Sequence, residues 1–120
     1  MNENDVTKLG FLLLDASRQT HAAHLMSKSL PYHETLKKVY EGLDDFGDQL
    51  VEAELGLGEE RQAFSPVKMP APGDKEATIS LLRQLSSAAN KLDSKDRGVN
   101  AILDNFCSSI NSWVFLLKQC

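Results

Sequence analysis

Residues 21–56 have the sequence HAAHLMSKSLPYHETLKKVYEGLDDFGDQLVEAELG and contain all three histidines of the chain. The segment predicts the end of one helix, a break at 27–31 and a second helix with an acidic side. Pro31 is tolerated in the first turn of a helix but not in its middle, and Ser29 is suited to cap the helix that follows. Because the break is short, the two helices should be antiparallel neighbours. Any chemistry of the protein is expected in this segment.

Apolar residues on both sides of the break recur every three or four positions, which is the spacing of a buried helix face. They predict helices over 4–27 and 31–55. The expected core residues of the first are Val6, Leu9, Leu13, Ala16, Thr20, Ala23 and His24, and those of the second are Leu36, Val39, Tyr40, Leu43, Phe46 and Leu50. Gly47 on the second stripe permits close approach of a neighbouring helix. Phe11, Leu12 and Leu14 add apolar surface on other sides of the first helix, which therefore needs several neighbours or a subunit contact.

The same periodicity predicts two further helices towards the end of the chain. Their ranges are 75–92, with Asp74 as the cap, and 96–118, with a cap at Ser94 or Asp96. The expected core residues are Ala77, Leu81, Leu82, Leu85, Ala88, Ala89 and Leu92 in the third helix, and Val99, Ile102, Leu103, Phe106, Ile110, Trp113, Val114 and Leu117 in the fourth. Each set follows one face of a helix, so all four helices can share a single core.

A long connection, residues 56–74, joins the second and third predicted helices and contains three of the four prolines. A connection of this length is expected to cross the bundle and not to form a hairpin. Phe64, Val67 and Met69 are the side chains expected to hold it against the surface. The sequence therefore predicts one all-α domain over residues 1–120, a four-helix bundle with a long crossover between helices two and three.

The composition is that of an ordinary globular protein, with 42% hydrophobic and 25% charged residues in 120 positions. The net charge of −4, without a basic tail, argues against sequence-independent binding of nucleic acid. There is no apolar run of about 18 residues that would span a membrane. Cys107 and Cys120 form no CxxC pair, which favours a reduced, cytoplasmic setting. We therefore expect a cytoplasmic protein that binds neither nucleic acid nor membranes.

The histidines and acidic residues are candidate metal ligands. Asp48 and Glu52 lie one turn apart on a second, charged stripe of the 31–55 helix, so both carboxylates can reach one cation. His24 lies on the core stripe of the preceding helix, and His21 lies one turn earlier. Such a set is suited to iron, zinc or manganese. The alternative is that the acidic residues form a solvated surface and the histidines are hydrogen-bonded core residues, and the spacing alone leaves both interpretations open.

Motifs for catalysis without a metal are missing from the sequence. The serines and histidines of residues 21–56 do not stand in a strand–turn–helix setting such as a nucleophile elbow. The glycines after Leu55 follow a helix and precede no strand–helix unit, so they do not predict a phosphate-binding loop. The chain is therefore expected not to be an enzyme unless a metal centre makes it one.

The central segment resembles a family of small uncharacterised proteins encoded by tailed bacteriophages. The pattern is H-x-x-H-L-x-[ST]-K-S, a further histidine, and Y-x-G-L-x-D-x-x-D-x-x-V-E. It is carried here by His21, His24, Leu25, Ser27, Lys28, Ser29, His33, Tyr40, Gly42, Leu43, Asp45, Asp48, Val51 and Glu52. Residues 99–117, VNAILDNFCSSINSWVFLL, are similar to that family's closing segment. The resemblance implies an accessory phage protein in the host cytoplasm that acts through its assembly as a homo-oligomer or through a host partner, which the sequence does not name.

The same segment is more distantly similar to the Dps mini-ferritins, which have a ferritin-like four-helix bundle. Their metal centre combines a histidine of the first helix with an aspartate and a glutamate of the second, from two subunits related by a two-fold axis. The resemblance implies a two-fold dimer through helices one and two. It also implies iron or another divalent metal at His24, His33, Asp48 and Glu52, with His21 and Asp44 peripheral. Lys37 departs from the pattern, because a further acidic residue is expected at its position.

Three functions are consistent with these patterns. The first is an accessory phage protein of ferritin-like fold, without catalytic activity and with optional metal binding. The second is a Dps-like ferroxidase, in which the carboxylates bridge two iron ions. The third is a structural or regulatory helical interaction protein, in which the same residues only stabilise a dimer. Oligomeric state and metal content distinguish the three.

Overall fold

The structure, a computed structural model, describes residues 4–61, 66 and 68–120. In this part of the chain it contains four helices and no strand. They are α1 (Asn4–Met26), α2 (Leu30–Gly56), α3 (Lys75–Asn90) and α4 (Arg97–Lys118). The prediction of an all-α protein with four helices is confirmed. The predicted ends at 27, 92 and 96 differ by one or two residues from those observed, which is the usual uncertainty of a helix boundary.

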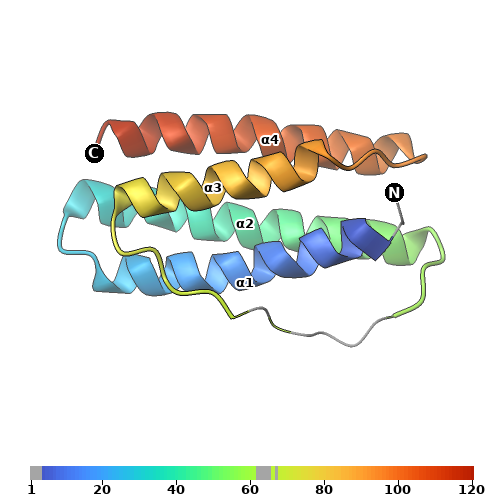
Figure 1. Cartoon of the computed structure of the whole chain (residues 1–120), viewed down its shortest axis with the longest axis horizontal. Helices are drawn as coiled ribbons and strands as arrows, with labels where there is room; N and C mark the ends of the chain where they lie inside the picture. Colours follow the sequence, from blue (N-terminus) through green and yellow to red (C-terminus); the bar gives the residue numbers. More distant parts are fainter. Residues whose placement is uncertain (1–3, 62–65, 67) are drawn as a thin grey trace.

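The four helices lie side by side along the long axis of the molecule, which measures 44 Å (Figure 1). α1 and α4 run in one direction, and α2 and α3 run in the other. α2 packs against both α1 and α4, and α3 packs against α4 and more sparsely against α1. As a result, the α1–α2 turn, the beginning of α3 and the end of α4 lie at the same end of the bundle.

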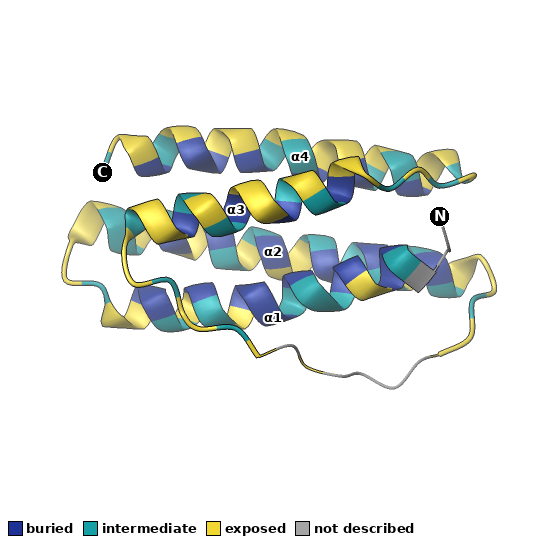
Figure 2. Cartoon of the chain, in the orientation of Figure 1, coloured by how far each residue is buried: buried dark blue, intermediate teal, exposed yellow. Residues whose placement is uncertain are grey.

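The core follows the predicted stripes (Figure 2). Every residue predicted to be buried in α1 is buried, and in α2 the same holds for Leu36, Val39, Leu43 and Leu50. Tyr40 and Phe46 are only half-buried. The expectation that Ala77 belongs to the core is wrong, because the buried face of α3 passes one position further along, through Thr78, Leu82, Leu85 and Ala89.

Glycines permit two close contacts in the bundle. A Cβ atom added at Gly47 would lie 2.7 Å from the carbonyl oxygen of Gly10, so α1 and α2 approach each other with almost no side chain between them. This confirms the predicted role of Gly47. At Gly42 an added Cβ atom would lie 2.1 Å from Cζ2 of Trp113, so the indole ring of α4 occupies the space over α2. The sequence pattern did not predict this second contact.

Side-chain caps fix the beginnings of α3 and α4. The carboxylate of Asp74 accepts from the backbone N–H of Ala77 over 2.8 Å, and that of Asp96 accepts from Val99 over 2.9 Å. The cap at Asp74 was predicted, and Asp96 was one of the two candidates for the cap of α4. Ser29 occupies the N-cap position of α2 but its side chain makes no capping hydrogen bond.

The connection between α2 and α3 is described in part. Met69 is half-buried and packs against the core, as predicted. The predictions for Phe64 and Val67 fall outside the described residues.

Candidate functional site

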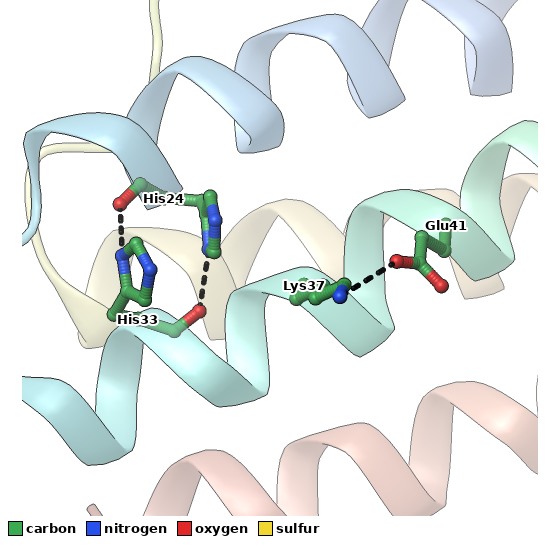
Figure 3. A network of polar contacts seen from close by, with 4 residues as sticks. All are labelled: His24, His33, Lys37 and Glu41. Atoms are coloured by element: carbon green, nitrogen blue, oxygen red, sulfur yellow. Dashed lines mark hydrogen bonds and ion pairs between the residues drawn. The ribbon is translucent and has the colours of Figure 1, made fainter.

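His24 and His33 join the two sides of the α1–α2 turn. Nδ1 of His24 donates to the carbonyl oxygen of His33 over 2.6 Å, and Nδ1 of His33 donates to the carbonyl oxygen of His24 over the same distance (Figure 3). The His24 carbonyl lies in the last turn of α1, where backbone acceptors lack partners within the helix. The two histidines therefore fasten the end of α1 to the beginning of α2. We call this reciprocal pair the histidine clasp.

Aromatic rings extend from the histidine clasp to the solvent. The two clasp rings are stacked, with centroids 3.6 Å apart. Tyr40 meets His24 edge-on at 5.2 Å, and His21 stacks on Tyr40 at 4.1 Å with only 4° between the ring planes. His24 is buried, His33 is half-buried and His21 is exposed. The structure thus brings together the three histidines that the sequence analysis singled out, with Tyr40 between them.

The hydrogen bonds of the histidine clasp determine what the rings can still bind. A carbonyl oxygen only accepts, so each ring carries a proton on Nδ1, and a neutral imidazole then keeps a lone pair on Nε2. A carbonyl partner at Nδ1 is also the usual support of a metal-bound histidine. The clasp is therefore compatible with a ligand or cation at Nε2. A groove of about 520 Å³ adjoins both rings and is lined by His24, Leu30, His33, Glu34, Lys37 and Tyr40.

The carboxylates of the predicted metal set lie elsewhere in the chain. Asp48 and Glu52 are exposed on α2, as are Glu41 and Asp44. At 1.5 Å per residue, Asp48 lies about 22 Å along the helix from His33. In the described part of the chain, no three histidine, cysteine or acidic side chains come together in a metal-binding group. One copy of the chain therefore does not assemble the set, and the prediction of a site shared between two copies remains a prediction.

Lys37 lies on the wall of the groove beside the histidine clasp. Its Nζ is 3.9 Å from Oε1 of Glu41, and both side chains are more than half exposed. Such a surface ion pair contributes little to stability. Because Lys37 lines the same groove as the two clasp rings, its positive charge disfavours the binding of a cation there.

A larger groove, of about 680 Å³, runs along the side of α1 and α2 that faces away from the core. We call it the outer groove. It is lined by Phe11, Leu14, Asp15, Ser17, Arg18, His21, Tyr40, Glu41 and Asp44. The apolar excess at Phe11 and Leu14 was evident in the sequence, but the contribution of Asp15 and Arg18 was not. Their positions fall between the helix stripes, and only the packing of α1 on α2 brings them to one surface.

Tyr32 links this end of α2 to α3. Its hydroxyl lies 2.7 Å from Oγ1 of Thr78, which itself donates to the backbone carbonyl of Asp74. Burial raises the pKa of the Tyr32 phenol above its ordinary value of 10.0, and the carboxylates of Asp74 and Glu76 add to this rise, whereas the hydrogen bond to Thr78 opposes it. The neutral phenol is therefore the form that the folded chain favours.

The raised pKa of Tyr32 leads to a testable prediction about the stability of the protein at alkaline pH. Because its folded-state pKa is raised, its contribution to stability is fully present below about pH 10 and is lost as the pH rises through the folded pKa. In a Tyr40→Phe variant the remaining phenol absorbance reports Tyr32. We expect its titration midpoint in the folded protein to lie above the midpoint in concentrated urea. Equal midpoints would contradict the assignment.

Comparison with known proteins gives no match: no protein-family model, no curated protein and no solved structure is significantly similar to this chain. Among the described helices, none is long and apolar enough to cross a membrane.

Proposed function

We propose that this chain is a ferritin-like helical interaction protein without catalytic activity, of the tailed-bacteriophage kind that its central motif resembles. It works as a two-fold homodimer formed by the outer grooves of α1 and α2. The directions of the helices support the ferritin-like topology, because α2 and α3 run the same way and a long link joins them (Figure 1). Ferritin-like bundles have one such crossover.

The outer groove is the observation that carries this proposal. It is lined in part by the side chains of Phe11 and Leu14, which are both only half-buried. Apolar surface of this kind, surrounded by polar residues, is typical of a protein–protein interface. At the α1–α2 turn, Leu25 and Met26 extend the apolar surface, with 69% and 80% of their area exposed.

The charges beside the outer groove favour a second copy as the occupant. In the described part of α1, Lys8 and Arg18 are the exposed side chains with a full charge, and both are basic. The facing side of α2 carries Glu41, Asp44 and Asp48. A two-fold axis that sets α1 of one copy against α2 of the other brings basic side chains to acidic ones twice.

The histidine clasp supports a structural and not a catalytic role for this segment. Each clasp ring uses Nδ1 to hold a backbone carbonyl, so its orientation is fixed by the turn it fastens. The stiff turn keeps α1 and α2 in register, and this register determines the shape of the outer groove. The predicted carboxylate ligands remain in solvent in one chain.

A Dps-like iron site is the second candidate, and the tautomer of the clasp favours it. Nε2 of His24 and Nε2 of His33 are both compatible with a cation, and the two-fold dimer would supply the carboxylates of Asp48 and Glu52 from the other copy. Lys37 on the groove wall opposes this candidate. For this reason we place it second.

A charge exchange across the outer groove tests the dimer. Arg18→Glu sets acidic groups against acidic groups and Asp44→Lys sets basic groups against basic ones, so each change is expected to weaken dimerisation by about tenfold or more. The double variant should recover much of this loss, because the exchanged charges attract again. Sedimentation equilibrium measures the dissociation constants, with Arg97→Glu on α4 as the control. If all four variants dimerise equally well, another surface forms the contact.

A further inference from the structure

A polar groove of about 540 Å³ lies between α3 and α4. It is lined by Arg83, Ser86, Ser87, Asn90, Lys91, Cys107 and Asn111. None of these residues lines the outer groove, so a ligand here would not compete with the proposed dimer contact. We call this second surface the α3–α4 groove.

Hydrogen bonds within the protein occupy acceptor oxygens of the α3–α4 groove, so hydrogen-bond donors remain for a ligand. Arg83 donates to Oδ1 of Asn111 over 3.0 Å, which holds the guanidinium group in place. Cys107 donates to Oδ1 of Asn90 over 3.5 Å. In both amides the oxygen is thus used within the protein, and the NH₂ group, which only donates, remains. Ser87 adds a hydroxyl that can donate as well.

The charges of the α3–α4 groove also favour a ligand that accepts hydrogen bonds and is negatively charged. Arg83 and Lys91 contribute two positive charges, and no carboxylate is found among the described residues that line the groove, although the chain as a whole carries a net charge of −4. A neighbouring cavity contains Asp93 and Asp104 and shares Asn90 and Cys107 with the groove. These carboxylates repel anions at that side, so the site for an anion lies towards Arg83.

From these donors and charges we propose that the α3–α4 groove binds a phosphate group, either as inorganic phosphate or as a phosphate monoester. The guanidinium group of Arg83 matches the geometry of two phosphate oxygens, and its bond to Asn111 reduces the conformational freedom that binding must remove. Lys91, the residue that follows α3, supplies a second positive charge. Ser87 and the amide NH₂ groups can donate to the remaining oxygens.

A titration followed by nuclear magnetic resonance tests this site. Inorganic phosphate and glycerol phosphate are added separately at constant ionic strength, with chloride as the reference anion. We expect saturable shifts of the side-chain NH₂ signals of Asn90 and Asn111. Removal of a charged hydrogen-bonding partner by Arg83→Gln or Lys91→Gln is expected to weaken binding by about tenfold each. Lys95→Gln, outside the groove, is the matched control and should bind as the unchanged chain does.

A comparison of the two probes shows whether the groove prefers inorganic phosphate or a phosphate monoester. Tighter binding of either one supports the proposed site. Shifts that do not saturate, or that Arg83→Gln leaves unchanged, would overturn the proposal, because they describe general attraction of anions to surface lysines. Alkylation gives an independent reading: bound phosphate should slow modification of Cys107, which lines the groove, and leave Cys120 unaffected. Equal protection of both thiols would also contradict the site.

Discussion

The Gly42→Ala substitution is expected to lower the free energy of unfolding by about 2 kcal/mol, because the new methyl group overlaps the indole of Trp113. The added Cβ atom would lie 2.1 Å from Cζ2 and 2.6 Å from Cη2 of that ring. Trp113 is 9% exposed and packs against Phe46, so any movement of its ring disturbs the packing of α2 against α4. The gain in helix propensity, about 1 kcal/mol, does not offset the overlap.

Urea denaturation followed by fluorescence measures this change, because Trp113 is the single tryptophan of the chain. The emission of the folded Gly42→Ala variant should also differ from that of the unchanged protein, since the ring has to move. Gly56→Ala is the matched control, because an added Cβ atom there meets nothing within 4 Å. We expect Gly56→Ala to be neutral or slightly stabilising. Equal stability of the two variants would show that α2 and α4 are not packed as described.

The His24→Ala substitution is expected to cost about 3 kcal/mol of unfolding free energy. It removes a ring that is 92% buried between Tyr40 and His33, and it leaves a cavity at the α1–α2 turn. It also removes the donor to the carbonyl of His33, which contributes about 1 kcal/mol. His21→Ala is the control: His21 is exposed and only stacks on Tyr40, so its loss should cost less than about 1 kcal/mol.

A double-mutant cycle tests whether the histidine clasp acts as a unit. If each ring supports the other, the combined His24→Ala and His33→Ala variant should be less destabilised than the sum of the single variants, by about 1 kcal/mol or more. Additive effects would mean that the two hydrogen bonds form independently. The free energies come from the same urea denaturation curves, with the dimer fraction held constant because dimerisation also stabilises the folded state.

The burial pattern of the bundle was largely predictable, because helix periodicity and the need to bury apolar side chains determine it. The expected stripe of α4 lies in the core apart from Ile102, which is half-buried. Asp74 was identified as a capping residue, and Asp96 as one of two candidates, because a capping side chain acts within one turn of the chain. The buried stripe of α2 continues to Glu54, which is 2% exposed. This residue was not predicted to be buried, because the periodicity of apolar residues gives no indication of a buried carboxylate.

Of the four predicted metal ligands, His24 and His33 lie together in the structure, whereas Asp48 and Glu52 lie elsewhere on α2. His24 and His33 were expected to be metal ligands or hydrogen-bonded core residues, and in the structure both are bonded through Nδ1 to backbone carbonyls. Reciprocal bonds to the backbone depend on how the two helix ends meet, which residue spacing does not specify. The α3–α4 groove was missed for a similar reason, because Arg83 and Asn111 come together only when their two helices pack.

The mass of the purified chain in solution, measured by light scattering together with its metal content, tests the central claim most directly. The proposed interaction protein should be a dimer with no bound metal, and Arg18→Glu should shift it towards the monomer. A dimer that retains iron would favour the Dps-like candidate instead. A chain that stays monomeric at the highest concentrations would contradict the central claim, because the outer groove would then have no second copy to cover it.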